Sequence, residues 1–214
     1  MITIMQNMRE QSQIAPHTPG VYIFRTGKTL VYVGKAADIR KRLGSYFRKN
    51  VSAKTAQMVR EATSLEWIET ASEIEALIKE AELIKAHLPK FNVLMRDDKN
   101  YFYVAVTRET FPRIFLTHQL QKDRIGRIKL KKGQGVDYLG PFTSGSALKE
   151  VLAMLRRIFS YCTCTQLHKR PCLNSQIGRC LRFCCVKPND ESQTTKAEYG
   201  KNIKNIISIL TGKK

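Results

Sequence analysis

The pattern of apolar residues near the start of the chain predicts a β-hairpin. Two prolines and a glycine within residues 16–20 would end any helix formed by the polar segment 1–15. The β-rich runs 21–25 and 30–33 follow, and the short glycine-containing segment 26–28 separates them. Two such runs around a short turn are typical of a hairpin.

Helical spacing and capping residues predict the elements that come next. Asp38 can cap a helix whose apolar residues recur at i, i+4, i+7 and i+8. A helix near 55–62 and a strand over 65–70 follow. Ser72 then begins a capping box, with a glutamate three residues later, which opens an amphipathic helix that runs to about His87.

The second half of the chain also mixes strands and helices. Its predicted elements are a hairpin of strands 101–107 and 113–117, a flexible loop over 119–135, a turn at Gly140-Pro141, and helices over 146–159 and 196–210. The helix over 146–159 carries an apolar face of Leu148, Val151, Leu152, Leu155 and Ile158. The whole pattern predicts an α/β (α+β) protein.

The charge of the chain favours a polyanionic partner. Its 37 Lys and Arg exceed its 18 Asp and Glu, which gives a formal net charge of +19. Basic residues gather in 25–60, 119–135 and 164–187, while six of the acids fall within 66–82. A basic face around a local acidic spot suits phosphate binding with a metal-holding carboxylate. We therefore expect nucleic acid as the first candidate and an anionic membrane surface as the second.

The sequence contains no apolar run long enough to span a bilayer. Such a span needs about 18 apolar residues, and residues 1–13 also lack the apolar core of a signal peptide. We therefore expect a soluble, cytoplasmic protein.

The predicted hairpin places chemically useful side chains close together. Tyr22 and Tyr32 lie in its two strands, so that their hydroxyl groups can share one side of the sheet. Gly34 would end the second strand and let its backbone approach a ligand closely. On the next helix, Arg42 lies one turn before Tyr46 on the same face.

Glu80 borders the apolar stripe of the helix that Ser72 opens. A carboxylate in that position needs a partner, and a divalent metal would satisfy it. Taken singly, each of these residues is more often structural: strand tyrosines pack in cores, arginines face solvent, and a glutamate at such an edge meets a lysine.

Taken together, these residues resemble the GIY-YIG nuclease family and, more narrowly, the domain that opens the UvrC family of bacterial excinucleases. The resemblance is carried by 20–22 (GVY), 32–36 (YVGKA), Arg42, Tyr46, Glu80, 75–77 (EAL), 83–85 (LIK), 91–93 (FNV, with Asn92), 96–99 (RDDK) and 138–142 (YLGPF). It covers most of 16–185, and it implies a small central antiparallel sheet flanked by helices.

The resemblance also implies roles for these residues. Glu80 would hold one Mg²⁺ or Mn²⁺, and Tyr32 or Tyr22 would orient or deprotonate the attacking water. Because tyrosine has a pKa of about 10, Lys35, Arg42 and the metal would have to favour the phenolate.

The remaining roles concern the phosphate and the frame of the site. Arg42 would neutralise charge that grows on the phosphate, Lys35 and Tyr46 would position it, and Asn92 would brace the site by hydrogen bonds. The basic residues assigned to DNA binding are Lys35, Arg40, Lys41, Arg48 and Lys49.

Six cysteines lie between positions 162 and 185. Their clustering favours a metal site over disulfides or scattered buried thiols, although the spacing matches neither a zinc ribbon nor a ferredoxin repeat. The resemblance implies a [4Fe–4S] cluster on Cys164, Cys172, Cys180 and Cys184, with zinc as the alternative. Cys162 stands where the family often has arginine, and Cys185 could replace Cys184 as the last ligand.

The resemblance predicts a metal-dependent DNA endonuclease of nucleotide excision repair that makes the 3′ incision next to a lesion. The alternatives are a non-catalytic DNA-binding or scaffold module with a structural Fe–S or zinc site, and a GIY-YIG nuclease of mobile elements, which would lack the cysteine segment. The expected partners are damaged double-stranded DNA and the excinuclease protein UvrB, with UvrA acting upstream, and no membrane.

The expected organisation is an N-terminal segment (1–15), a GIY-YIG nuclease domain (16–95), a linking β-hairpin and helix region (96–160), a cysteine-rich cluster (161–187) and a C-terminal helix (188–214). The chain ends where the family's UvrB-binding segment would begin, and the second nuclease domain is also missing. We therefore expect either a naturally short homologue or the N-terminal piece of a longer or split protein.

Overall fold

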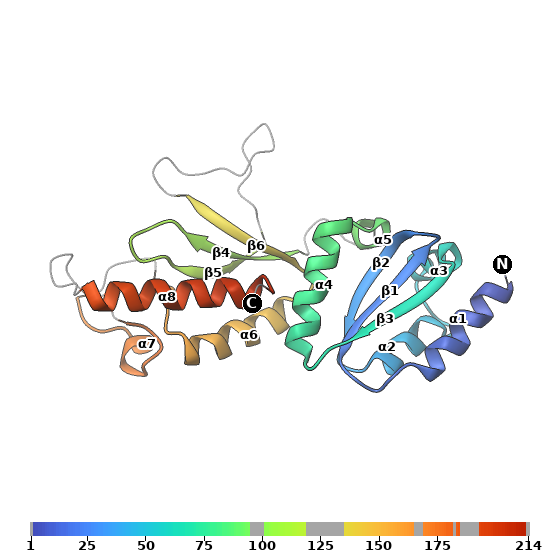
Figure 1. Ribbon diagram of the computed structural model, residues 1–214, viewed down its shortest axis with the longest axis horizontal. Coiled ribbons are helices and arrows are strands. Elements are labelled where there is room, and N and C mark those ends of the chain that lie inside the picture. Colours follow the sequence, from blue (N-terminus) through green and yellow to red (C-terminus); the bar gives the residue numbers. More distant parts are fainter. Residues whose placement is uncertain are drawn as a thin grey trace. The chain divides into compact units, whose positions relative to one another are not determined.

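The chain forms two compact units, Met1–Asn100 and Tyr101–Lys214, and each has a three-stranded antiparallel sheet of its own (Figure 1). The computed structural model describes residues 2–94, 101–118, 135–164, 169–181, 183–184 and 193–212. The predicted loop over 119–135 lies almost wholly outside the described residues, as do Cys185 and the 96–99 motif. The mixed α/β class is confirmed.

The predicted hairpin forms the centre of the first unit. The strands are β1 (Gly20–Thr26), β2 (Thr29–Ala36) and β3 (Ser64–Glu69), in the order β2-β1-β3. Tyr22 lies opposite Gly34, and Phe24 lies opposite Tyr32. Because side chains alternate between the faces of a sheet, this register places all three aromatic residues on one face.

Five helices surround this sheet: α1 (Ile2–Ile14), α2 (Ile39–Tyr46), α3 (Ala53–Glu61), α4 (Glu73–His87) and α5 (Lys90–Leu94). The predicted caps are confirmed, because Asp38 accepts a hydrogen bond from Lys41 N and Ser72 accepts one from Glu75 N. The capping box differs in one detail. The Glu75 carboxylate accepts a hydrogen bond from Ala71 N at 2.8 Å, one residue before the expected donor.

The aromatic face of the first sheet is buried under helices. Its core joins Tyr22 and Phe24 to Met8 of α1, Leu43 of α2 and Met58 of α3. The N-terminal segment is therefore a regular helix that contributes to the core. Further along the sequence, α4 contacts both β1 and β2, which brings its residues next to the hairpin.

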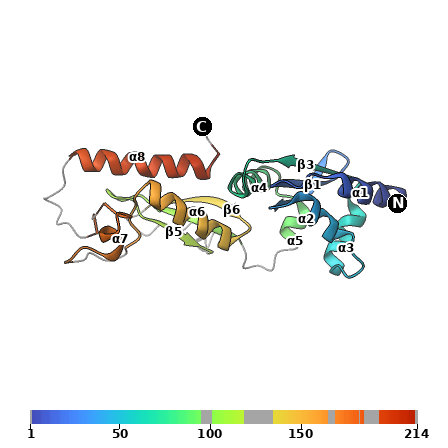
Figure 2. The same ribbon diagram turned by 90° about the horizontal axis from the view of Figure 1, so that it is seen from below.

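The second unit is built on β4 (Phe102–Thr107), β5 (Ile114–Thr117) and β6 (Val136–Phe142), in the order β5-β4-β6. Its helices are α6 (Gly145–Ile158), α7 (Leu173–Gln176) and α8 (Gln193–Leu210). Figure 2 shows α6 running along this sheet. The Tyr199 hydroxyl ties α8 to the unit, since it donates to Pro112 O at 2.6 Å and accepts from Cys162 N at 3.0 Å.

The turn predicted at Gly140-Pro141 is wrong, because both residues lie inside β6. Phe102 pairs with Phe142 and Val104 pairs with Leu139, so two residues of β6 face Tyr103 alone. This is a β-bulge on an edge strand, and it is one of the few places where a sheet accommodates proline.

The apolar face predicted for α6 is confirmed except at its last residue. Leu148, Val151, Leu152 and Leu155 are buried, whereas Ile158 is 64% exposed. Ile158 is the last residue of α6 and lies at the margin of the apolar face. Helical periodicity assigns it to that face but does not specify where the face stops being covered. None of the described helices is long and apolar enough to cross a membrane.

Candidate active site and cysteine cluster

Three tyrosines and one arginine form a hydrogen-bonded cluster on the helix-covered face of the first sheet. The Tyr22 and Tyr46 hydroxyl oxygens lie 2.7 Å apart, and the Tyr46 hydroxyl donates to that of Tyr32 at 3.3 Å. Arg42 Nε donates to the Tyr22 hydroxyl at 3.1 Å. The hairpin register positions Tyr22 and Tyr32, and α2 positions the other two residues, so the predicted grouping is present in the structure.

Gly34 makes room for this cluster. A Cβ atom at Gly34 would lie 2.3 Å from the Tyr22 hydroxyl oxygen, well inside van der Waals contact. The expectation that Gly34 ends the second strand is wrong, because β2 continues to Ala36. The glycine is instead required by the Tyr22 ring that packs on the strand.

Burial determines the protonation of two of the phenols. It raises the pKa of Tyr22, and the neighbouring Tyr32 raises it further, while Arg42 lowers it. Burial likewise raises the pKa of Tyr46, with Tyr22 as the next cause. The positive charge of Arg42 therefore does not outweigh the effect of burial. Tyr22 and Tyr46 are protonated phenols at neutral pH and can donate hydrogen bonds. Tyr32 is the member of the cluster that is only half-buried.

Glu80 is a buried carboxylate beside the same strand. Its side chain is 4% exposed, and Oε1 accepts a hydrogen bond from Lys35 N at 3.0 Å. Its neighbours on α4, Lys79 and Glu82, form an ion pair in solvent at 2.9 Å. A carboxylate oxygen is a ligand that Mg²⁺ and Mn²⁺ prefer, so Glu80 fits a site for such an ion.

The tyrosine cluster and Glu80 meet at adjacent residues of β2. Tyr22 packs against Gly34, and the Glu80 carboxylate bonds to the main chain of Lys35. Phenol, guanidinium and carboxylate groups therefore converge on one short stretch of strand.

Asn92 hydrogen-bonds to the free edge of β2 at Val33, two residues before Lys35. Its Oδ1 accepts from Val33 N and its Nδ2 donates to Val33 O, both at 2.8 Å. Asn92 thus satisfies the two main-chain groups that an additional strand would otherwise pair. It holds the strand that carries the cluster and does not itself belong to the cluster.

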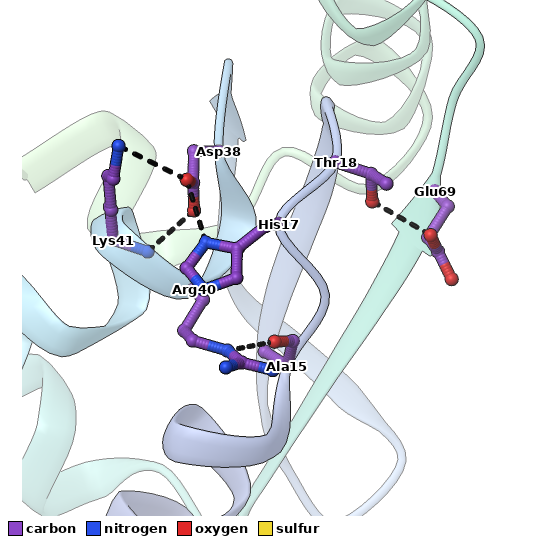
Figure 3. A network of polar contacts seen from close by, with 7 residues as sticks. All are labelled: Ala15, His17, Thr18, Asp38, Arg40, Lys41 and Glu69. Atoms are coloured by element: carbon purple, nitrogen blue, oxygen red, sulfur yellow. Dashed lines mark hydrogen bonds and ion pairs between the residues drawn. The ribbon is translucent and has the colours of Figure 1, made fainter.

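The basic residues assigned to DNA binding differ in how much of the side chain is free of contacts, and Figure 3 shows two of them, Arg40 and Lys41. Arg40 Nε donates to Ala15 O, so part of its guanidinium holds the segment that leads into β1. Lys41 is 80% exposed and lies 3.6 Å from Asp38, which also contacts His17 at 2.9 Å. Arg48 and Lys49, after α2, are both exposed, and Lys35 is half-buried.

The described cysteines of the second unit lie close enough to share metal ions. Two groups have all their sulfur atoms within 4.8 Å of one another, namely Cys162, Cys180 and Cys184, and Cys164, Cys172 and Cys184. Cys184 belongs to both groups, and its sulfur lies 3.6 Å from that of Cys172. Of the four cysteines predicted from the sequence, Cys164, Cys172 and Cys184 form one group, and Cys180 belongs to the other.

Cys162 is a residue that the sequence interpretation set aside and that the structure includes. The residue is 3% exposed, and its thiol lies close to those of Cys180 and Cys184. Hydrogen bonding from Cys180, the largest effect, lowers the pKa of Cys162 to about 5 despite its burial. The tight clustering of all six cysteines was the signal that could have included it.

Comparison with known protein families agrees with this geometry. Residues 18–93 match the UvrC-like GIY-YIG domain, and residues 101–209 match the middle domain of the UvrC/Cho excinucleases. The fold and site of the first unit thus define a GIY-YIG endonuclease domain.

Full-length relatives extend the match over nearly the whole chain. UvrABC system protein C of Caldicellulosiruptor saccharolyticus is 39% identical over 98% of this chain and 34% of its own length. The same protein of Treponema denticola is 38% identical over 99% of this chain and 30% of its own length. The chain belongs to the UvrC/Cho excinuclease family, and it spans about a third of the length of these relatives.

A solved structure is also similar to part of this chain. The N-terminal GIY-YIG endonuclease domain of UvrC from Thermotoga maritima, bound to magnesium as its catalytic divalent cation, is 40% identical, covers 41% of this chain and 97% of its own, and has a TM-score of 0.39.

Proposed function

We propose that this chain is a DNA endonuclease that uses a divalent metal ion to make the 3′ incision next to a lesion in nucleotide excision repair. The observation that carries the proposal is the convergence of the tyrosine cluster and the Glu80 carboxylate on Gly34 and Lys35 of β2. Metal-dependent hydrolysis of a phosphodiester needs a group that orients the attacking water, a group that stabilises charge on the phosphate, and a metal ligand, and these side chains are suited to all three tasks.

Each residue of the cluster has a part in this proposal. Glu80 would hold Mg²⁺ or Mn²⁺, whose chemistry is to polarise the scissile phosphate and stabilise the leaving 3′ oxygen. Arg42 is an exposed residue whose guanidinium donates to Tyr22 through Nε and lies over the Tyr46 ring, so its other N–H groups can bind phosphate oxygens. Tyr32, which is half-buried, is better placed than the deeply buried Tyr22 to orient the attacking water.

The test compares Glu80→Gln with Glu82→Gln, which removes an exposed carboxylate from the same helix. Both variants and the parent protein are assayed for nicking of a lesion-containing duplex with Mg²⁺, with and without UvrA and UvrB. We expect Glu80→Gln to lose about 100-fold or more in rate, while Glu82→Gln nicks like the parent. A Glu80→Gln protein that nicks at the parent rate would remove Glu80 from the reaction, whereas a parent protein that never nicks would favour the non-catalytic binding module.

The same proposal concerns partners. The family relationship supports damaged double-stranded DNA as the substrate, and UvrB, with UvrA upstream, as the proteins that deliver it in the cytoplasm. The nicking assay with and without these two proteins tests whether this chain depends on them.

We further propose that the cysteine cluster holds a metal centre. The family resemblance supports a [4Fe–4S] cluster on Cys164, Cys172, Cys180 and Cys184. The 3.6 Å separation of Cys172 and Cys184 favours zinc instead, since four thiolates at 2.3 Å around one tetrahedral ion lie about 3.8 Å apart. Anaerobically purified protein with broad visible absorption would establish iron–sulfur, and colourless protein that contains stoichiometric zinc would exclude it.

A further inference from the structure

A groove runs between α1 and α3 in the first unit, and the C-terminal end of α2 forms part of its wall. Its volume is about 950 Å³, near the upper end of the range for small-ligand sites. The lining residues that matter here are Arg9, Tyr46, Phe47, Arg48, Val59 and Arg60. No sequence motif points to this groove, because its walls come from three helices that are separate in the chain.

The groove combines positive charge with an apolar floor. Arg9, Arg48 and Arg60 are all exposed, and none of them forms an ion pair with a carboxylate in the part of the chain that the structure describes. Phe47 is half-buried and packs at the edge of the core. Arginines that bind phosphates beside an aromatic ring that stacks on bases are the usual means of holding single-stranded nucleic acid.

Tyr46 connects the groove to the proposed active site. Its hydroxyl belongs to the tyrosine cluster, at 2.7 Å from that of Tyr22, and the residue also lines the groove. Tyr46 is therefore shared by the tyrosine cluster and the wall of the groove, so the groove is the hollow next to the cluster on this side of α2.

We propose that this groove binds an unstacked nucleotide of the cleaved strand next to the scissile phosphate, a role that rests on the proposed endonuclease function. Phe47 would stack on the base, and Arg48 and Arg60 would bind its flanking phosphates. Glu10 is the one acidic residue among those that line the groove. Its carboxylate would repel a phosphate from its part of the α1 wall, and it would accept a hydrogen bond from a base amino group.

The test measures binding separately from cutting. The probe is a short single-stranded oligonucleotide that carries the fluorescent base 2-aminopurine, and the full chain with Glu80→Gln is the parent, so that the strand stays intact. Phe47→Leu keeps an apolar side chain in the core but removes the stacking ring. Arg60→Glu reverses a charge inside the groove, and Lys54→Glu makes a matched charge change on α3 outside it.

We expect the parent to quench 2-aminopurine emission on binding. Phe47→Leu should weaken binding by at least about fivefold and remove the quenching, because the base loses the aromatic ring on which it stacks. Arg60→Glu should weaken binding and lower the salt dependence, whereas Lys54→Glu should have the smaller effect of the two.

Two results would overturn the proposal. One is unquenched emission in the bound parent, and the other is equal binding by Phe47→Leu, Arg60→Glu and Lys54→Glu. Either would leave the endonuclease function untouched if the wild-type chain nicks damaged DNA. Conversely, the wild-type chain could show quenching that depends on Phe47 and yet never nick DNA. That result would support nucleotide binding in the groove and contradict the proposed endonuclease function.

Discussion

Asn92 satisfies the main chain of Val33 from a position 59 residues further along the sequence. Replacing it by alanine leaves a buried N–H and a buried C=O of β2 without their partner, so we expect Asn92→Ala to lower the free energy of unfolding of the first unit by about 2 kcal/mol. Denaturant titration followed by Trp67 fluorescence measures this. Asn50→Ala, at an exposed site after α2, is the control and should change stability by less than about 0.5 kcal/mol. Equal stability of the two variants would contradict the bracing role.

The buried phenols predict how stability responds to alkaline pH. Below about pH 10, Tyr22 is protonated in both the folded and the unfolded chain, so its burial adds no pH dependence. Above that pH the unfolded chain ionises this tyrosine while the folded chain, whose Tyr22 pKa is raised by burial, does not. Stability must therefore fall as pH rises, by up to about 1.4 kcal/mol per pH unit for each such group.

The Tyr22→Phe variant isolates this contribution. It loses hydrogen bonds to Tyr46 and Arg42 at every pH, so the slope of the melting temperature above about pH 10 is the informative quantity. We expect the variant to have a shallower slope than the parent. Identical slopes would mean that Tyr22 ionises in the folded protein as it does in the unfolded chain.

At the scale of the elements, a glycine of β2 is required for packing, whereas a glycine of the neighbouring helix α2 is not. A Cβ at Gly34 would lie 2.3 Å from the Tyr22 hydroxyl, whereas one at Gly44, on α2, meets nothing within 4 Å. We expect Gly34→Ala to destabilise the first unit by about 1–3 kcal/mol and to abolish nicking, because Tyr22 must move. Gly44→Ala should instead stabilise α2 by about 0.5–1 kcal/mol and leave nicking intact. Thermal unfolding and the nicking assay test both variants, and tolerance of Gly34→Ala would contradict the packing seen here.

The elements that could be predicted from the sequence are those with local signals. Asp38 and Ser72 cap α2 and α4 through hydrogen bonds that span three residues, and the turn of the first hairpin is equally local. β6 could not be predicted, because Gly140-Pro141 is typical of a turn and only pairing with β4 makes it a bulge.

The same distinction applies to the candidate site. Side chains alternate between the two faces of a strand, and this period, together with the predicted hairpin, was enough to group Tyr22 with Tyr32. The contact between Glu80 and Lys35 joins residues 45 positions apart, and the groove beside Tyr46 needs three helices. These depend on how helices pack on the sheet, which apolar periodicity does not specify.

At the scale of the whole molecule, the two units contain different chemistry and different cores. The tyrosine cluster and Glu80 belong to the first unit, and the described thiols belong to the second. The aromatic core of the first unit consists only of residues before Asn100. A metal centre on the cysteines should therefore stabilise the second unit, because binding to the folded form adds directly to its free energy of unfolding.

The only tryptophan of the chain makes this testable, since Trp67 lies in β3 and packs against the core of the first unit. We expect removal of the cysteine-bound metal by a chelator to leave the Trp67 unfolding transition unchanged. Far-UV circular dichroism, which also reports α6 and α8, should show an earlier transition, because the Tyr199 hydroxyl that anchors α8 bonds to Cys162 N within the cysteine segment. Cys184→Ser, which removes the thiol shared by both sulfur groups, should reproduce the effect, and Cys164→Ser should produce a smaller one. A chelator-induced shift of the Trp67 transition would instead mean that the stability of the first unit depends on the metal centre of the second.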